Sequence, residues 1–258
     1  MQTSTSIPAQ RHQLIQEYLL THTGISIKEA ASLCNVSEAT ARRDLDDLAA
    51  EGILDRTHGG AVIHKGTALE EYQGKKMSVM VDEKKRIAKA AMQFIKDEDS
   101  IFLDSGTTCL FLGYELQPFQ RLTVITNNLS VASSVLLDTT STMIVTGGVR
   151  RDGYDVLIGD ITEKLIREFN VDITFVGADA VSVENGVYNS CCLEVGVKKS
   201  IITSGKKKIL LADHSKFEKT SLIKICDIES FDVVITDDKI EENIRKILEK
   251  KAINLLIV

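Results

Sequence analysis

The chain has 258 residues, enough to bury a sizeable core, so either one large domain or two unequal domains are possible, and we expect two. Hydrophobic residues make up 43% and charged residues 26% of the sequence, which is typical of a folded soluble protein. No apolar run is long enough to span a membrane and the amino terminus lacks the apolar segment of a signal peptide, so we expect a cytoplasmic protein without a membrane partner. The net charge of -6 argues against a chain that coats nucleic acid nonspecifically, although it allows a local basic surface.

The cysteines show no Cys-x-x-Cys spacing, and their number is odd. This pattern indicates neither a disulfide framework nor a zinc site, so we expect reduced thiols, no metal and no cofactor. The adjacent Cys191 and Cys192 are compatible with a redox sensor, but unreactive cysteines are the commoner case in such a context.

The amino-terminal residues predict three short helices followed by a hairpin. Apolar residues share one face of a helix over residues 11–22, Ser26 is suited to cap a second helix over 27–34, and Ser37 to cap a third over 38–52. Two short strands around a Gly59-Gly60 turn follow within residues 53–63. This order is the winged form of the helix-turn-helix, in which the last helix lies in the major groove of DNA.

The third helix is expected to bury Ala41, Leu45 and Leu48, which recur at helical spacing. Arg43 then lies on the opposite face and Arg42 on its flank. Either arginine can donate two hydrogen bonds to a guanine, although an ion pair with Asp44, Asp46 or Asp47 is the alternative for each. The serine and threonine at the helix start can bond a phosphate or a base edge.

Residues 35–62, NVSEATARRDLDDLAAEGILDRTHGGAV, resemble the DNA-binding signature of the DeoR/GlpR family of bacterial sugar-operon regulators. The Ser-x-x-Thr helix start, the Arg-Arg-Asp-Leu core and the Arg-Thr-His-Gly-Gly-Ala wing all match. Outside this context the wing arginine would be a plain surface charge and the wing histidine a solvated turn residue. The resemblance and the chemistry together give the candidate DNA-binding residues Lys28, Ser37, Thr40, Arg42, Arg43, Arg56 and His58.

Residues 1–63 are therefore expected to form the DNA-binding domain, 64–81 a linker, and 82–258 a larger, mostly parallel α/β domain. The last region alternates helical stretches with apolar strands, SIFL, LTVIT, TMIVTGG, DITFVG, KKILLA, FDVVIT and INLLIV. Continuous apolar strands separated by helices are typical of a parallel sheet that is covered on both faces.

Three polar turns follow strands of this domain and could surround one crevice at the sheet edge. The turn at 104–108, DSGTT, offers backbone amides and hydroxyls where a helix begins, an arrangement suited to a phosphate. It lacks the Gly-Lys-Ser/Thr ending of a P-loop, which argues against ATP or GTP. Taken alone, the Ser-Gly-Thr-Thr turn is most often just a well-capped helix start, and an ordinary turn is the commoner case for each of the others. Their candidate residues are Asp104, Ser105, Gly106, Thr107, Thr108, Thr126, Asn127, Asn128, Gly147 and Gly148.

The carboxyl-terminal region resembles the sensor domain of the same family, whose motifs DSGTT, TNN, TGG, GAD and ADHSKF occur here in family order. That fold is similar to ribose 5-phosphate isomerase. By an ungapped count, Val176 and Ala180 replace acidic residues of the isomerase, Asn189 replaces its lysine, and Lys198 stands where its glutamate base belongs. Without that carboxylate, proton abstraction beside a sugar carbonyl loses its essential group, and we expect no enzyme.

The resemblance implies that Asp179 accepts hydrogen bonds from sugar hydroxyls and that Lys198 adds positive charge suited to a phosphate. Lys198 is equally consistent with a solvated position on its helix. Lys216 and Asp213 are implied as pocket or hinge groups, Tyr188 and Glu194 as further pocket residues, and His214 as a polar loop residue rather than a metal ligand.

The function implied is a DNA-binding transcriptional regulator, a repressor of a carbohydrate-utilisation operon that a phosphorylated sugar releases from double-stranded operator DNA. We expect a homo-oligomer, a dimer or a tetramer. The alternative is a sugar-phosphate isomerase-like enzyme with an added DNA-binding module.

Overall fold

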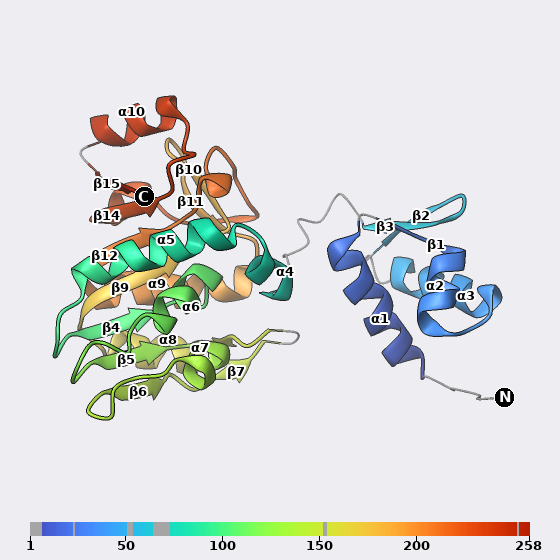
Figure 1. The fold of residues 1–258 in the computed structure, drawn as a ribbon, viewed down its shortest axis with the longest axis horizontal. Helices are drawn as coiled ribbons and strands as arrows, with labels where there is room; N and C mark the ends of the chain where they lie inside the picture. Colours follow the sequence, from blue (N-terminus) through green and yellow to red (C-terminus); the bar gives the residue numbers. More distant parts are fainter. Residues whose placement is uncertain (1–6, 23, 51–53, 64–72, 152–153, 252) are drawn as a thin grey trace. The chain divides into compact units, whose positions relative to one another are not determined.

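A computed structural model of the chain describes residues 7–22, 24–50, 54–151, 154–251 and 253–258, except 64–72. Contacts divide the chain into two units, Met1–Lys75 and Lys76–Val258. Figure 1 traces both units along the sequence. Within the described residues, no helix combines the length and apolar character that crossing a membrane requires.

The first unit contains three helices and a small antiparallel sheet. The helices are α1 (Pro8–Thr21), α2 (Ile27–Cys34) and α3 (Glu38–Ala50), and the strands β1 (Gly24–Ser26), β2 (Leu54–Thr57) and β3 (Gly60–Ile63) lie in the order β1-β3-β2. Ser26 and Glu29 form a capping box at the start of α2, and Asn35 ends that helix in the left-handed conformation, with a φ of 52°. These local signals explain why the helices lie where the sequence predicts them.

The sheet of the first unit differs from the predicted hairpin in two respects. β1 adds a strand that the sequence analysis did not contain, and it pairs with β3. Gly60 belongs to β3 rather than to the turn, and it pairs with Ser26 of β1. A Cβ on Gly60 would lie 2.0 Å from the carbonyl oxygen of Ile25. The glycine therefore permits the close approach of β1.

The core of the first unit is formed by all three helices. Ala41, Leu45 and Leu48 are fully buried, as predicted for α3, and Ile15 of α1 is buried with them. This unit therefore has a hydrophobic core of its own.

The second unit is built on a parallel sheet of seven strands in the order β15-β14-β12-β9-β4-β5-β6. All seven predicted strands are present, and every pair in this sheet is parallel. The strands are β4 (Ser100–Leu103), β5 (Thr123–Thr126), β6 (Thr142–Val145), β9 (Val171–Gly177), β12 (Gly205–Leu211), β14 (Val233–Thr236) and β15 (Asn254–Ile257).

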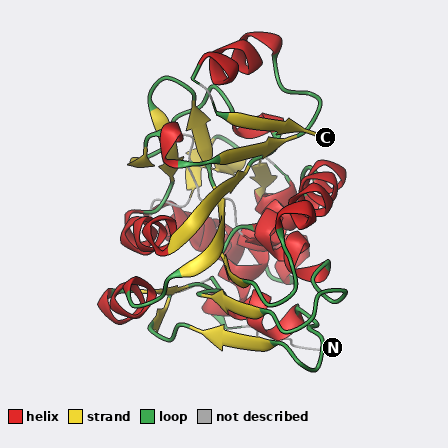
Figure 2. Ribbon diagram, turned by 90° about the vertical axis from the view of Figure 1, so that its left-hand side faces the viewer, coloured by secondary structure: helices red, strands yellow, loops and turns green. Residues whose placement is uncertain are grey.

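Helices cover both faces of this sheet (Figure 2). One face packs against α5 (Val81–Ala91), α6 (Thr107–Tyr114) and α7 (Leu129–Ser134) through side chains such as Leu103, and the other against α8 (Asp160–Arg167), α9 (Cys192–Ser204) and α10 (Glu242–Lys250) through side chains such as Phe102. Neighbouring residues of β4 thus belong to two different cores. This explains why the strands are apolar without alternation.

Shorter elements complete the second unit. β10 (Ala180–Ser182), β11 (Gly186–Asn189) and β13 (Ile223–Cys226) form an antiparallel sheet, and β7 (Val149–Arg150) pairs with β8 (Leu157–Ile158). The 3-10 turns are η1 (Met92–Phe94), η2 (His214–Lys216) and η3 (Ile228–Ser230). A short helix, α4 (Gln73–Ser78), lies inside the stretch expected to be linker, and its residues from Lys76 onward count with the second unit.

Candidate functional site

The outward face of α3 presents two arginines. Arg42 and Arg43 are both exposed, and within the described residues neither forms a hydrogen bond or an ion pair. The alternative in which they pair with neighbouring carboxylates does not occur, because Asp44 is bound by Arg11 and Asp46 by Arg56. Both guanidinium groups are therefore free to contact another molecule.

The start of α3 uses its two hydroxyl residues for capping. Ser37 Oγ accepts a hydrogen bond from the Thr40 amide at 3.2 Å and lies 3.0 Å from the Thr40 hydroxyl. Ser37 is exposed, as is Lys28 on α2. Ser37 and Thr40 thus fix the helix end and still lie at the surface that carries the arginines.

The predicted wing residues differ in their surroundings. Arg56 in β2 is held within the unit, since its Nε lies 2.7 Å from Asp46 of α3 and its guanidinium also donates to the Gly60 carbonyl. His58, at the turn of the hairpin, is exposed. Arg56 therefore ties the wing to α3, and His58 is the wing residue that is open to solvent.

In the second unit, polar turns meet at the carboxyl ends of β4 and β9, the adjacent strands at which the chain reverses its direction of progress through the sheet. In open parallel sheets such a switch point is where ligands bind. The turns contact each other through glycines: a Cβ on Gly106 would lie 3.4 Å from the Cα of Gly177. A Cβ on Gly177 would lie 3.5 Å from the Cα of Gly106, so the two turns pack directly against each other.

Asp104 is the centre of this switch point. Its carboxylate is completely buried, accepts a hydrogen bond from the Gly177 amide at 2.9 Å and forms an ion pair with Lys198 of α9. Lys198 also donates to the Gly177 carbonyl, at 3.2 Å. Lys198 is 4% exposed, so the interpretation as a solvated helix residue is wrong.

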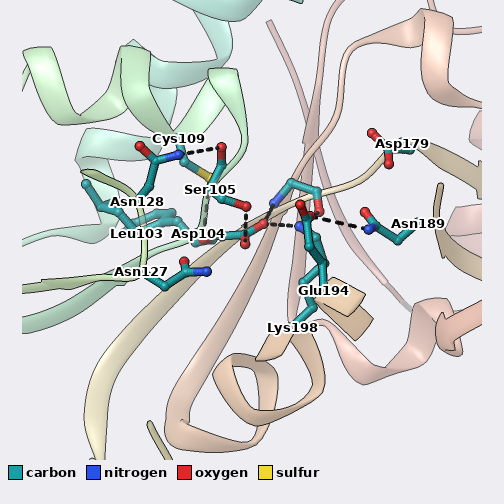
Figure 3. Close-up of polar contacts among 12 residues, drawn as sticks. Leu103, Asp104, Ser105, Cys109, Asn127, Asn128, Asp179, Asn189, Glu194 and Lys198 are labelled. Atoms are coloured by element: carbon teal, nitrogen blue, oxygen red, sulfur yellow. Dashed lines mark hydrogen bonds and ion pairs between the residues drawn. The ribbon is translucent and has the colours of Figure 1, made fainter. Parts of the chain in front are cut away.

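Lys198 is charged because several carboxylates surround it. Burial would lower the pKa of Lys198, but Asp104, Glu194 and Asp179 together raise it above its ordinary value. Figure 3 shows Lys198 and Glu194 between Asp104 on one side and Asn189 and Asp179 on the other. The cluster is therefore a set of paired charges at the carboxyl ends of the central strands.

The DSGTT turn beside this cluster has unused donors. Among the described residues, the main-chain N–H groups from Ser105 to Thr108 donate to no acceptor, and the hydroxyls of Thr107 and Thr108 form no hydrogen bond. Both threonines are 6% exposed. A helix start with several free donors is suited to an anion such as a phosphate.

The TNN turn after β5 supports the DSGTT turn. Thr126 Oγ1 donates to the Leu103 carbonyl at 2.8 Å, and Asn128 donates to the Ser105 carbonyl at 3.2 Å while its own oxygen caps α7. Asn127 is 1% exposed and its Oδ1 has no partner among the described residues. An amide oxygen left without a partner in a buried polar site is suited to accept a hydrogen bond from a ligand.

The TGG turn after β6 bonds to α8. Gly147 accepts a hydrogen bond from the Thr162 hydroxyl at 2.8 Å, and a Cβ on Gly148 would collide with that same hydroxyl. Both glycines have positive φ, 65° and 123°. Within the described part of the chain, no hydrogen bond joins them to the Asp104 cluster, so they position α8 and the start of β7.

Asp179 follows β9 and is also held in an ion pair. Its Oδ1 lies 2.6 Å from Lys76 Nζ of α4, and its Oδ2 accepts from the amide and hydroxyl of Ser190, at 2.9 and 2.6 Å. Burial alone would raise the pKa of Asp179, but Lys76 and Ser190 keep it well below its ordinary value. The carboxylate is therefore ionised, so both of its oxygens act as hydrogen-bond acceptors.

The sequence analysis missed two residues of the cluster, Lys76 and Arg151, and named a third, Asn189, only as a replacement for the lysine of the isomerase. Lys76 lay in the expected linker, and the loop between β7 and β8 brings in Arg151, which binds Glu194 at 2.8 Å and lies 3.9 Å over the ring of Tyr154. Asn189 donates to the other oxygen of Glu194, at 3.4 Å. A basic pair, Arg150-Arg151, directly after the TGG turn is the sequence signal that could have indicated this loop.

The remaining candidates lie beyond β11 and β12. Asp213 is buried and accepts from the Ser215 amide, and His214 bonds Asp237 at 2.8 Å. Lys216 is half-buried, and its ammonium has no partner among the described residues. No contact joins these residues to Asp104 in the described structure. Of the adjacent cysteines, Cys191 is buried and Cys192 is exposed, and both are free thiols.

Comparison with known families gives two matches. The family described as the DeoR C terminal sensor domain matches residues 79–238, and the DeoR-like helix-turn-helix domain matches residues 11–67.

Curated relatives match almost the whole chain. The HTH-type transcriptional regulator IolR of Bacillus subtilis is 30% identical and covers 90% of this chain and 92% of its own length. The L-fucose operon activator of Haemophilus influenzae is 30% identical, with 94% and 97% covered, and the glycerol-3-phosphate regulon repressor of Escherichia coli is 29% identical, with 95% and 97% covered. Among solved structures, ribose 5-phosphate isomerase A of Methanocaldococcus jannaschii is 21% identical with a TM-score of 0.38, covering 53% of this chain and 54% of that chain.

Proposed function

The chain belongs to the DeoR family of helix-turn-helix transcriptional regulators, and we propose that it represses a carbohydrate-utilisation operon until a phosphorylated sugar fills its sensor domain. The observation that carries the effector half of this proposal is the DSGTT turn. Its free amides and threonine hydroxyls adjoin the paired charges of Asp104 and Lys198. The turn supplies neutral donors for a phosphate, and the carboxylates supply acceptors for sugar hydroxyls.

DNA recognition in this proposal is assigned to α3. Arg43, and with it Arg42, reads or positions the operator, Ser37, Thr40 and Lys28 contact its backbone, and His58 lies on the wing. Arg56 acts by holding the wing against α3. We propose residues 1–63 as the DNA-binding domain and the cytoplasm, where the operator is, as the place of action.

The effector site is proposed around the switch point of the sheet. Asp104, the DSGTT and TNN turns, Asp179 and Lys198 line it, while Gly147 and Gly148 shape the adjoining turn and Lys216 stands apart. We also propose a symmetric homo-oligomer. Its support is the apolar side chain of Ile161 on α8, 68% exposed, and that of Leu193 at the start of α9, 58% exposed.

We propose that the protein is a repressor, although one relative is named a repressor and another an activator. Deleting the gene should raise transcription from the operon that it controls. A fall in transcription would reverse the sign and leave the effector site untouched.

A gel-shift titration tests the proposal as a whole. The full-length protein should bind a promoter fragment from beside its own gene, and one sugar phosphate from a panel should release it and raise its melting temperature with concentration. The matching unphosphorylated sugar should do neither. If no sugar phosphate changes the melting temperature, the sensor assignment fails.

The isomerase-like alternative has its own assay. The position that carries the base in the isomerase pattern holds Lys198, which is buried and paired with Asp104. A lysine in this state cannot abstract a proton, because the nitrogen of an ammonium has no free lone pair to accept one. Incubation with ribose 5-phosphate should therefore yield no ketose.

A further inference from the structure

Lys76 links α4 to the candidate effector site. It lies in α4, directly after the last residue of the first unit, and its Nζ is 2.6 Å from Asp179 Oδ1. The side chains are only 23% and 17% exposed. An ion pair so shielded from solvent is screened by salt less than a surface pair is.

Lys76 occupies the oxygen of Asp179 that nothing else uses. Ser190 donates twice to Oδ2, through its amide and its hydroxyl, whereas Oδ1 receives only the ammonium of Lys76 among the described residues. A carboxylate oxygen accepts about two hydrogen bonds. A sugar hydroxyl that bonds Asp179 must therefore approach Oδ1, and because only 17% of the Asp179 side chain is exposed, it competes there with the ammonium of Lys76 for the accessible surface.

Other contacts of α4 come from the core and from the neighbouring helix α5. α4 itself has six residues, too few for a helix to be stable without tertiary contacts. Met77 packs against the core. The buried ammonium of Lys84 in α5 donates hydrogen bonds to the Lys76 carbonyl and, at 2.7 Å, to the Val79 carbonyl. Lys84 fixes the end of α4 to α5, while the side chain of Lys76 fixes it to the turn after β9.

We propose that Lys76 is a positioning residue of the effector site, which binds Asp179 while the sensor is empty and is displaced when effector hydroxyls take that carboxylate. Displacement removes one of the contacts that hold α4, the helix that precedes the rest of the second unit in the chain. The inference rests on the proposed function and names the contact through which effector binding is communicated.

Competition between Lys76 and the effector for Asp179 determines whether each affinity should rise or fall. If Lys76 and the effector exclude each other, removing the ammonium tightens sugar-phosphate binding and weakens operator binding, because it favours the arrangement that the effector selects. A lysine that contacts the phosphate would give the opposite result, weaker effector binding. A lysine that only stabilises the fold would change neither affinity once the protein is folded.

Hydrogen exchange of the full-length protein, read by mass spectrometry, tests the release of α4. The variants are Lys76→Met, the conservative Lys76→Arg, and Lys89→Met as a control at an exposed lysine of α5. Without ligand, amides of residues 76–80 should exchange roughly tenfold faster in Lys76→Met than in the wild type. Lys76→Arg should restore most of the protection, and Lys89→Met should change nothing.

The probes are inorganic phosphate and a panel of sugar phosphates that includes ribose 5-phosphate and glycerol 3-phosphate. Inorganic phosphate has no sugar hydroxyls, so it should protect residues 105–109 and leave α4 unchanged. A sugar phosphate that protects 105–109 should also speed exchange at 76–80, and it should bind Lys76→Met at least about fivefold more tightly than the wild type.

The outcomes separate the two proposals. If no phosphate compound protects residues 105–109, the proposed function fails and the competition inferred from it falls as well. If a sugar phosphate protects them while 76–80 stays unchanged, or binds Lys76→Met no more tightly than the wild type, only the role of Lys76 is overturned. Should Lys76→Met fail to fold, the same comparison with Lys76→Gln decides the matter.

Discussion

Arg11 of α1 and Asp44 of α3 form a two-armed ion pair inside the first unit, with Nε 2.7 Å from Oδ2 and Nη2 2.8 Å from Oδ1. The side chain of Arg11 is 11% exposed and that of Asp44 only 3%. The pair joins α1 to α3, the helix that carries Arg43. Acidic residues on one helix thus have different roles: Asp44 holds the fold, whereas Asp47 is exposed.

Asp44→Ala should destabilise the first unit by about 3 kcal/mol, because it leaves a mostly buried guanidinium without its partner. Asp47→Ala on the same helix is the control and should change the free energy of unfolding by less than about 0.5 kcal/mol. Urea unfolding followed by circular dichroism measures both. Equal stability of the two variants would show that the Arg11–Asp44 pair contributes nothing to the fold.

Arg43→Ala should weaken operator binding by about 1 to 3 kcal/mol, roughly 5- to 150-fold, without lowering stability. The arginine is exposed and forms no hydrogen bond or ion pair within the described residues, so its loss should affect DNA binding rather than folding. Gel shifts with Arg43→Ala, Arg42→Ala and the wild type give the comparison. The two arginines should differ, and operator binding at wild-type strength by Arg43→Ala contradicts the assignment of α3.

The elements that sequence reasoning located well are those that local chemistry determines. Ser26 and Ser37 cap their helices as expected. The strands of the parallel sheet could be recognised because burial on both faces makes each a short apolar run, as in residues 233–236, all buried.

What the sequence could not indicate depends on residues far apart in the chain. β1 is only three residues long, and it is a strand because β3 lies beside it. Lys76 lies 103 residues from Asp179, in a stretch with no clear period, and nothing local distinguishes it from a solvated lysine. Asp44 is another such case, because only the position of Arg11 makes a carboxylate stable there.

Thr107→Val should weaken binding of the sugar-phosphate effector by roughly 1.5 to 3 kcal/mol, because one hydroxyl donor to a charged phosphate is lost without a change in side-chain size. Operator binding in the absence of effector should remain at the wild-type level, since the first unit has its own core. Calorimetric titration with the sugar phosphate that shifts the melting temperature measures the effect. If Thr107→Val binds it as tightly as the wild type, the phosphate does not lie at the DSGTT turn.

Protonation of Asp172 should lower the free energy of unfolding in acid. A hydrogen bond from Lys206, joined by two from Ser100, lowers the pKa of Asp172 from 3.8 to about 2. Because the folded-state pKa is the lower one, the stabilisation is present above pH 4 and is lost as the pH falls toward 2.

Asp172→Asn should therefore show a flatter loss of stability between pH 4 and pH 2 than the wild type. The carboxylate is 38% exposed and Lys206 62% exposed, so the part due to Lys206 should shrink in high salt while the part due to Ser100 remains. Thermal melts across this pH range, at low and high salt, provide the check. Parallel curves for the variant and the wild type would assign the acid step to other carboxylates.

The buried pair of Asp104 and Lys198 gives the sharpest test of how the second unit is held together. Lys198→Met should lower the free energy of unfolding by about 3 to 5 kcal/mol, because the carboxylate of Asp104, with no exposed surface, loses its counter-charge. The double variant Asp104→Asn, Lys198→Met leaves no net charge at the site and keeps an acceptor for the Gly177 amide, so it should recover much of that loss. Denaturant unfolding of the two single variants and the double variant measures the coupling. Lys198→Met and the double variant should both bind operator at temperatures where the first unit is folded. Neither of these two variants should respond to a sugar phosphate. A double variant no more stable than Lys198→Met would mean that the cost comes from lost packing of the lysine chain rather than from an unpaired charge.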